Sequence, residues 1–334
     1  MSATGDHSAP APATIETLTL NPAVDKNTSL DHVAAERKLR CAPPRFEPGG
    51  GGINVSRAIR KLGGASSAFF LSGGPTGRLL EELLAKEGID RHPFAVPGRT
   101  RENLNVTEEA TGRQFRFVFP GPEVPSEAWR RCLDAVEALD PPPAYLAASG
   151  SLPPGLPTDA YARVAEIVRP RGTRVIMDTS GPALRATLRA PVYLLKPNLK
   201  ELATLAGKPL EDEASVERET RKLIEEGRCE AVVVSLGGGG ALLATREGLY
   251  RFHAPAVPIR SKVGAGDSMV AGLTLALARG RPLPEAVRFG VAAGTAAVMT
   301  PGTELCRRAD VERLFPRVTV IPFPSHENLP RTTA

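Results

Sequence analysis

Short apolar runs alternate with amphipathic segments along most of the chain. The runs that predict strands are Ile15–Leu20, Ala68–Leu71, Tyr145–Ala148, Arg174–Asp178, Tyr193–Lys196, Ala231–Ser235 and Ala241–Ala244. Apolar spacing typical of helices covers Ile53–Leu62, Gly77–Glu87, Ser126–Leu139, Thr158–Val168, Lys200–Leu205, Glu213–Glu226, Asp267–Arg279 and Leu283–Met299. This alternation predicts an α/β fold with a mainly parallel sheet, helices on both faces, and ligands beyond the carboxyl ends of the strands.

Two stretches, residues 25–48 and 99–122, break the alternation. The first is polar and contains proline, and the second reads as two strands, Leu104–Thr107 and Gln114–Phe119, joined by a tight turn at Thr111-Gly112. Aromatic or apolar residues alternate with polar ones in the second strand, so one of its faces is wet or meets a ligand. We expect a small β-sheet lid here, inserted into a body of residues 15–24, 49–98 and 123–322.

Composition narrows the class of protein. Residues 1–14 are rich in Ala, Pro, Ser and Thr and predict a disordered extension without the apolar core of a signal peptide, and residues 323–334 predict a flexible tail. No apolar run is long enough to span a membrane. The four cysteines lie far apart without a CxxC pair, which disfavours zinc and disulfides and favours the reducing cytoplasm.

The formal net charge of +5 raises the question of an anionic partner. There is no block of five or six Lys or Arg, and aromatic residues make up only 5% of the chain. Both features disfavour nucleic acid and membrane surfaces as partners. Anionic metabolites fit the charge better.

Glycine runs mark two places where a ligand could approach the backbone. Gly49–Gly52 stands directly before the predicted helix at Ile53, so bare N–H groups lie at a helix start, although a glycine run alone is also typical of a flexible loop. Gly237–Gly240 follows a predicted strand, where a nucleotide phosphate or ribose could approach, or where a plain hairpin turns. Neither run matches a Walker A loop or a dinucleotide fingerprint.

The segment Val263–Ser268 (VGAGDS) carries the strongest chemical signal. Three small residues before a helix present consecutive N–H groups and the positive end of the helix dipole to an anion. Asp267 stands at that mouth and is either a general base for a hydroxyl proton or a simple helix N-cap.

In Lys196–Glu201 (KPNLKE), Asn198 and Glu201 are three residues apart at a strand-to-helix junction. That spacing places both side chains on one helical face. A carboxylate and an amide there suit a Mg²⁺ held largely through water, and the same pair is typical of a capping arrangement.

Together these motifs resemble the PfkB group of ribokinase-like sugar kinases. The matching segments are PGGGGINVSRAIRKLGG, SGSLPPG, KPNLKE, VVVSLGGGGA and SKVGAGDSMVAGL, in order between about Thr17 and Cys306. Within the group, the segments Arg37–Arg40 and Phe46–Pro48, with Met269, are similar to the minor-type 6-phosphofructokinases. The opening Thr19–Asp25 is closer to kinases of tagatose 6-phosphate or fructose 1-phosphate. The resemblance implies a ribokinase-like, Rossmann-type sandwich with a lid.

The resemblance also implies roles for individual residues. It makes Asp267 the catalytic base and Gly264, Ala265 and Gly266 the anion hole. It assigns sugar hydroxyls to Asp25, Gly49, Gly50 and Asn54, the substrate phosphate to Arg101, Arg116 and Ser151, the ATP site to Lys196, Asn198, Ser235, Gly237 and Gly240, and Mg²⁺ to Glu201. The lid would pair with a second subunit's lid in a homodimer, where Arg40 reaches the neighbour's substrate and Lys38 a nucleotide. Arg101 and Arg116 lie in the predicted lid hairpin, where guanidinium forks could grip a phosphate.

Three positions depart from the group's pattern near the nucleotide and the site of a K⁺-like ion. Lys262 replaces a Thr, Thr300 an Asn and Glu304 an Arg. A lysine beside the anion hole could supply charge that K⁺ supplies in relatives, so we expect the activity to depend little on K⁺.

The sequence therefore predicts an ATP- and Mg²⁺-dependent kinase that converts fructose 6-phosphate to fructose 1,6-bisphosphate in glycolysis. Tagatose 6-phosphate and fructose 1-phosphate are alternative acceptors, because one hydroxyl's configuration changes no motif. The two arginines argue against an uncharged sugar or nucleoside. A sugar-phosphate-binding regulator without catalysis is a further alternative, which the intact Asp267, anion hole and Glu201 disfavour.

Overall fold

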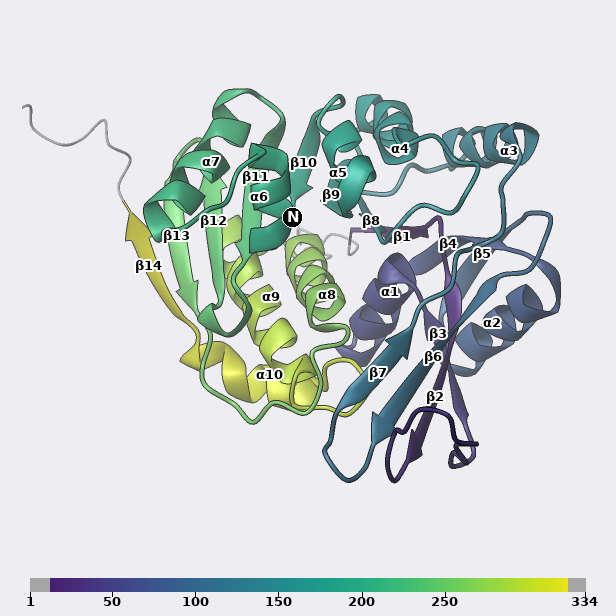
Figure 1. The fold of residues 1–334 in the computed structure, drawn as a ribbon. Helices are drawn as coiled ribbons and strands as arrows, with labels where there is room; N and C mark the ends of the chain where they lie inside the picture. The colour runs from purple at the N-terminus through teal and green to yellow at the C-terminus, as the bar shows by residue number, and fades with distance from the viewer. Residues whose placement is uncertain (1–12, 324–334) are drawn as a thin grey trace, which may run out of the picture.

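The computed structural model describes residues 13–323, which form a large sheet covered by helices and a small separate sheet (Figure 1). The large sheet has ten strands in the order β14-β13-β12-β11-β10-β9-β8-β1-β4-β5. Their bounds are β1 Ile15–Thr19, β4 Ser67–Ser72, β5 Asp90–Ala95, β8 Tyr145–Ser149, β9 Arg174–Asp178, β10 Val192–Leu195, β11 Cys229–Ser235, β12 Ala241–Thr245, β13 Gly248–His253 and β14 Thr319–Phe323. The strands from β5 to β11 pair in parallel, and β12 to β14 complete one edge as antiparallel strands.

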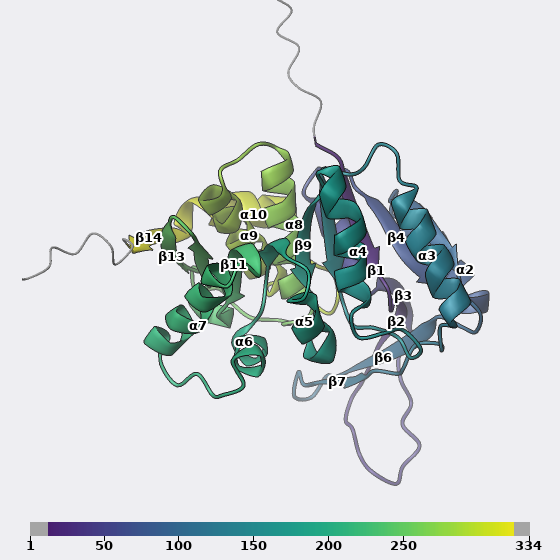
Figure 2. The same cartoon turned by 90° about the horizontal axis from the view of Figure 1, so that it is seen from above.

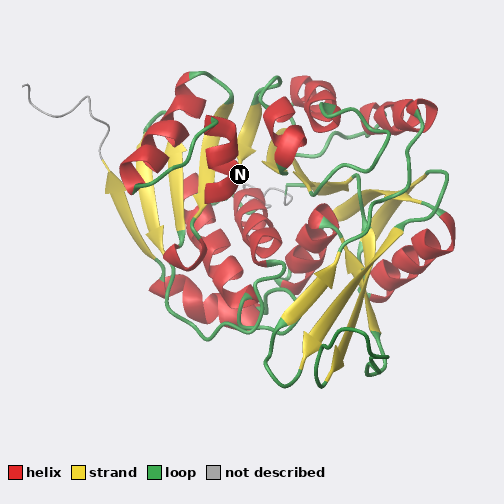
Figure 3. Cartoon of the chain, viewed as in Figure 1, coloured by secondary structure: helices red, strands yellow, loops and turns green. Residues whose placement is uncertain are grey.

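Helices cover both faces of this sheet, as Figure 3 shows. Their bounds are α1 Gly51–Lys61, α2 Gly74–Lys86, α3 Ser126–Glu137, α4 Ala160–Val168, α5 Gly181–Thr187, α6 Leu199–Ala206, α7 Glu213–Glu225, α8 Ala265–Ala278, α9 Leu283–Ala297 and α10 Arg308–Leu314. The prediction of an α/β fold with a mainly parallel, helix-covered sheet is confirmed.

The strands carry apolar side chains to both faces, because both are buried. In β8, Leu146 and Ala148 join a core cluster with α3 and α4, whereas Tyr145 and Ala147 join a second cluster with α1, α8 and α9. The period of two along each strand thus divides its side chains between two cores. Helix α8 packs between α1 and α9 in the second core, and its first turn opens at the carboxyl end of the parallel strands (Figure 1).

The small sheet has the order β3-β2-β6-β7 and lies beside α1 and α2 (Figures 1 and 3). Its strands are β2 Ala23–Leu30, β3 Arg45–Gly49, β6 Arg101–Glu108 and β7 Gln114–Phe117, and its central pair, β2 and β6, is parallel. We call this sheet and its connections, residues 23–49 and 101–119, the lid. Its strands come from the two stretches that break the sequence pattern.

The connection from β2 to β3 extends away from the body, as Figure 2 shows. It carries Lys38 and Arg40 as exposed side chains. Most of the predicted extension, residues 1–14, and of the predicted tail, residues 323–334, lies outside the described residues. At the described ends both predictions are wrong, because Thr14 Oγ1 accepts a hydrogen bond from the Ala144 N–H at 3.1 Å and Phe323 belongs to β14. Within residues 13–323, no helix combines the length and apolar character needed to cross a bilayer.

Candidate active site

A cavity of about 520 Å³ lies between the glycine turn after β11, the segment before α8, and α9. Its lining residues are Ser235, Gly237, Gly238, Gly240, Ala254, Pro255, Ala256, Val257, Ile259, Lys262, Ala265, Gly266, Met269, Val291, Gly294, Thr295 and Val298. The volume and the mainly apolar lining suit a nucleotide-sized ligand. The structure therefore brings predicted ATP-site residues from β11 and its turn together with the predicted anion hole.

The start of α8 has the geometry that an anion hole needs. Gly264 is the N-cap residue with a φ of 73°, a left-handed conformation that glycine adopts without strain. The N–H groups of Ala265 and Gly266 belong to the first helical turn, which has no intrahelical acceptor for them. Asp267 is the third helical residue, so the alternative that it caps the helix is wrong.

The Asp267 carboxyl is instead held by a side chain from α1. Its Oδ2 accepts a hydrogen bond from Asn54 Nδ2 at 2.9 Å. Burial raises the pKa of Asp267 to about 7, with the Asp178 carboxyl adding to the rise and the Asn54 hydrogen bond opposing it. A carboxylate with a pKa near neutrality is suited to accept a proton from a hydroxyl.

The orientation of Asn54 is fixed by Arg57, a residue that the sequence patterns did not single out. Arg57 Nη1 donates to Asn54 Oδ1 at 3.4 Å, which leaves the Asn54 amide group to donate to Asp267. Arg57 is buried and forms an ion pair of 2.8 Å with Glu87. The sequence could have indicated this contact, because Arg57 follows Asn54 by three residues in a predicted helix and residues three apart share a helical face.

Lys196 forms a buried ion pair with Asp178, which the sequence analysis also missed. The Lys196 Nζ and Asp178 Oδ1 atoms are 3.1 Å apart. Burial opposes the charged form of Lys196, but the carboxylates of Asp178, Glu201 and Asp267 together outweigh it, so the pKa of the lysine is raised. Asp178 is the last residue of β9, and a carboxylate at the carboxyl end of a parallel strand was the signal that could have found it.

Asn198 and Glu201 form a capping box at the start of α6. Asn198 Oδ1 accepts from the Glu201 backbone N–H at 2.9 Å, and Glu201 Oε2 accepts from the Asn198 N–H at 2.8 Å. The capping alternative is therefore what the structure shows. Burial raises the pKa of Glu201. Its second oxygen, Oε1, is not used by the cap.

On the lid side, Asp25 faces Gly49. A Cβ atom on Gly49 would lie only 2.6 Å from Asp25 Oδ2, so a side chain there would displace the carboxylate. Asn103 Nδ2 donates to Asp25 Oδ1 at 2.8 Å, and burial raises the pKa of Asp25. Asn103 is a third residue of the site region that the sequence analysis did not name.

Arg101 is anchored where β1 turns into the lid. Its Nη2, Nη1 and Nε donate to the carbonyl oxygens of Asn21 at 2.9 Å, Phe119 at 3.1 Å and Pro22 at 3.4 Å. A guanidinium has five N–H donors, so two stay available after these three contacts. Arg101 is thus a structural anchor whose free donors can still meet a phosphate.

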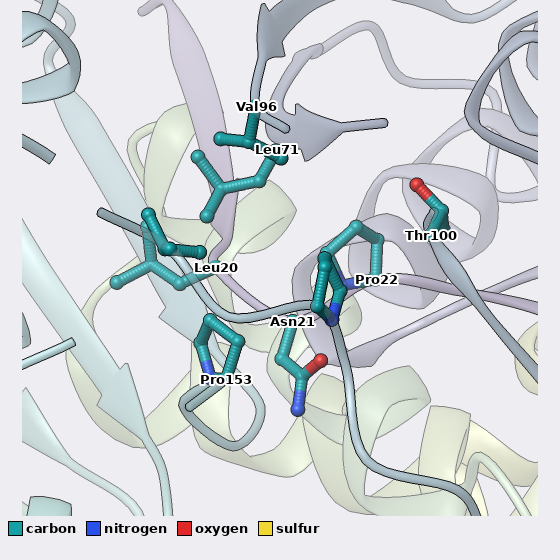
Figure 4. Close-up of a pocket in the computed structure, with 9 residues that line it drawn as sticks. Leu20, Asn21, Pro22, Leu71, Val96, Thr100 and Pro153 are labelled. Atoms are coloured by element: carbon teal, nitrogen blue, oxygen red, sulfur yellow. The ribbon is translucent and has the colours of Figure 1, made fainter. Parts of the chain in front are cut away.

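Ser151 lies beside the same turn. Asn21 Nδ2 donates to Ser151 Oγ at 3.0 Å and to the Leu152 carbonyl at 3.3 Å. Figure 4 shows Pro22 across a small cavity from Leu20, Leu71 and Pro153, with the Asn21 amide directed away from Leu71. The cavity between these residues is about 10 Å³, room for about one water and not for a sugar.

The lid touches the body along the segments before α8 and after α9. Asn27 Nδ2 donates to Thr303 Oγ1 at 3.3 Å, and Gln114 Oε1 lies 3.3 Å from Ser261 Oγ. Between them is a cavity of about 50 Å³ lined in part by Arg116. Lys38 and Arg40 line neither the 520 Å³ cavity nor the 50 Å³ cavity.

Comparison with known proteins agrees with this geometry. The family model described as "pfkB family carbohydrate kinase" matches residues 18–310. The ATP-dependent 6-phosphofructokinase isozyme 2 of Mycobacterium tuberculosis is 47% identical over 301 residues, which cover 90% of this chain and 88% of that protein. The chain belongs to the pfkB family of carbohydrate kinases.

Other members of the family extend the comparison. The 1-phosphofructokinase of Bacillus subtilis is 34% identical over 92% of this chain and 99% of its own length. The complex of Escherichia coli phosphofructokinase-2 with fructose-6-phosphate is similar with a TM-score of 0.86 at 41% identity, and its complex with potassium with a TM-score of 0.88 at 42% identity. Each covers 91% of this chain and 99% of the other. The prediction of a ribokinase-like sugar kinase is confirmed.

Proposed function

We propose that this chain is an ATP-dependent 6-phosphofructokinase that transfers the terminal phosphoryl group of ATP to the 1-hydroxyl of fructose 6-phosphate, giving fructose 1,6-bisphosphate. The observation that carries the proposal is the position of Asp267 in the first turn of α8, directly after Ala265 and Gly266, which line the 520 Å³ cavity. The greater identity to a 6-phosphofructokinase, 47% against 34% for a 1-phosphofructokinase, favours the 6-phosphate acceptor.

The proposed chemistry follows from the groups at this junction. ATP would lie in the cavity, with its phosphates at the glycine turn and at the N–H groups of Ala265 and Gly266. Asp267 would accept the proton of the attacking hydroxyl while the helix start stabilises the charge on the transferring group. Asp25, Gly49, Gly50 and Asn54 would bind sugar hydroxyls, and Arg101, Arg116 and Ser151 the acceptor's phosphate.

ATP consumption over a panel of acceptors tests the proposal. Fructose 6-phosphate should be the best acceptor and free fructose a poor one, because free fructose offers the two arginines no anion. Preference for fructose 1-phosphate or tagatose 6-phosphate would support the kinase activity but show that the proposed acceptor is wrong. If none of these acceptors supports ATP consumption, the alternative of a non-catalytic sugar-phosphate-binding regulator is favoured.

Mg²⁺ fits the site as a largely hydrated ion. Residues 13–323 contain no cluster of three or more His, Cys, Asp or Glu able to enclose a metal, and Mg²⁺ in such sites is held by phosphates and water with one or two carboxylates. Glu201 would supply a carboxylate through Oε1, and Lys196 and Asn198 would stand beside it on the ATP side. When bound, the ion neutralises phosphate charge. Omission of Mg²⁺ from the transfer assay tests this requirement.

We further propose that the activity depends little on K⁺. The Lys262 side chain brings a fixed positive charge to the cavity at the start of α8. Glu304 is engaged by Arg307, with Oε1 2.7 Å from Nε, and Thr300 Oγ1 donates to the Leu305 carbonyl at 2.9 Å. The rate in K⁺ should therefore match the rate in a bulky organic cation at fixed Mg²⁺ and ionic strength. Strong activation by K⁺ would contradict this, and would favour a site formed by backbone carbonyls near Val263 and residues 300–304.

We propose a homodimer formed through the lid. The lid exposes large apolar side chains: Phe117 is 50% exposed, Val118 59% and Phe119 53%. Small isolated sheets are marginal in water, and a second lid would bury these groups. In such a dimer the projecting β2–β3 connection could carry Arg40 to the neighbour's substrate and Lys38 to its nucleotide.

Light scattering at micromolar concentration should give twice the 35.4 kDa chain mass. Phe117→Asp should weaken the dimer, because it places a charge in the apolar interface. The exposed Asp134→Asn on α3 is a control that should leave the mass unchanged. A fully active monomer would refute the proposal. Residence in the cytoplasm and the lack of nucleic-acid or membrane partners stay predictions from composition.

A further inference from the structure

Polar side chains are scarce in the 520 Å³ cavity. Of the described residues that line it, only Ser235, Lys262 and Thr295 carry a polar side chain. The Thr295 hydroxyl already donates to the Val291 carbonyl at 2.8 Å, within α9. Lys262 is therefore the one ionisable group among the described lining residues.

The ammonium of Lys262 has no anionic partner within the described part of the chain. Lys26, Lys196, Lys208 and Lys222 each lie within 4.0 Å of a carboxylate, but no described carboxylate lies that close to Lys262. The Lys262 side chain is exposed, although it faces a cavity. An unpaired cation at the wall of a mainly apolar cavity fits an anionic ligand. The exposed ammonium is hydrated when the cavity is empty, and an anion can replace that water.

The lining of the cavity combines two kinds of surface. Val257, Met269, Val291 and Val298 contribute apolar side chains, which suit a nucleoside base. Gly237, Gly240, Ala265 and Gly266 leave backbone exposed, and the helix start at Ala265 and Gly266 favours negative charge. Lys262 lines the same cavity and precedes Ala265 by three residues.

We infer that Lys262 binds the triphosphate of the nucleotide. Its ammonium and the N–H groups in the first turn of α8 would bind the phosphates together. The inference rests on the proposed kinase function and adds a residue to its nucleotide site. Lys196 lies against the same turn, since its Nζ is 3.7 Å from the position of a Cβ on Gly266. Lys196 is held by Asp178, whereas Lys262 is free to follow the phosphates.

Calorimetric titration of ATP, ADP and adenosine separates a phosphate contact from a base contact. Lys262→Met should weaken ATP binding about 10- to 100-fold, the usual loss for one charged hydrogen bond, and should leave adenosine binding unchanged. Lys262→Arg should retain most of the ATP affinity. In turnover, Lys262→Met should raise KM for ATP and leave KM for the sugar phosphate unchanged.

Arg260→Met is the matched control, because Arg260 is an exposed cation two residues away that does not line the cavity. It should bind ATP as the unmodified chain does. Equal ATP binding by Lys262→Met, or an equal loss of ATP and adenosine, would overturn the inference and leave the kinase proposal standing. An unmodified chain that binds no ATP would overturn both.

Discussion

Asp267→Asn should abolish most turnover while the fold is kept. Loss of a general base typically costs on the order of 10²- to 10⁴-fold in rate, because the amide cannot accept the hydroxyl proton. The fall should appear in kcat, with KM for ATP little changed. Asp134→Asn on the exposed face of α3 controls for the loss of one carboxylate. A variant with near-normal kcat would show that another group takes the proton.

The raised pKa of Asp267 leads to two further expectations, one for the pH dependence of kcat/KM and one for the unfolding temperature of Asp267→Asn. With a pKa of about 7, the base loses its active, ionised form as the pH falls, so kcat/KM should drop about tenfold per unit below pH 7. The same shift means that ionised Asp267 costs folding free energy above that pH. Asp267→Asn should therefore unfold, at pH 8, at the same temperature as the unmodified chain or higher. A clear loss of stability would mean that the carboxylate is structural.

Arg101→Ala should raise KM for the sugar phosphate about 10- to 100-fold and leave KM for ATP nearly unchanged. Contacts of a guanidinium to an anion are each worth about 1.5–3 kcal/mol, and 1.4 kcal/mol is a factor of ten. The three backbone carbonyls that Arg101 holds make its position rigid, so the free donors reach the phosphate at little entropic cost.

Arg101→Lys separates the two roles of this side chain. It keeps the charge but lacks the planar fork whose three nitrogens reach the three carbonyls, so an anchoring role predicts a lower melting temperature for both variants. Arg113→Ala, an exposed arginine in the turn of the same hairpin, should change neither constant. A rise confined to KM for ATP would refute the assignment of Arg101 to the sugar phosphate.

Strong periodicity made the body predictable. The predicted helices differ from the observed ones by up to three residues at an end, as for Gly77–Glu87 against α2 Gly74–Lys86. The pattern missed three strands of the large sheet. Two of them, β5 (DRHPFA) and β14 (TVIPF), each contain a proline and lie at an edge of the sheet. The third, β13 (GLYRFH), lies between β12 and β14, and its buried residues do not alternate regularly with exposed ones. Helices α5 and α10, of seven residues each, were also missed, because they are too short to show a periodic face.

The lid was harder to predict because few of its residues are buried. Strand β2 (AVDKNTSL) is mainly polar beyond Val24, and only pairing with β3 and β6 shows it to be a strand. The turn between β6 and β7 was placed correctly at Thr111-Gly112, but the connection has five residues, 109–113, and not the tight turn expected.

Within the candidate site, local motifs predicted individual residues but not their contacts. The pairing of Asn54 with Asp267 and of Lys196 with Asp178 joins segments far apart in sequence, so no spacing could indicate it. The sequence left two interpretations of Asn198 and Glu201 open, a helix capping box and a Mg²⁺ site, because the same two residue types suit both.

The central claim is that the carboxyl of Asp267 and the cavity beside α8 together phosphorylate a sugar phosphate. The most direct measurement is phosphorus NMR of the purified chain with ATP, Mg²⁺ and fructose 6-phosphate, alongside the Asp267→Asn variant. The account predicts equal amounts of ADP and fructose 1,6-bisphosphate from the unmodified chain, and little of either from the variant. ADP with inorganic phosphate alone, or bisphosphate from both chains at the same rate, would contradict it.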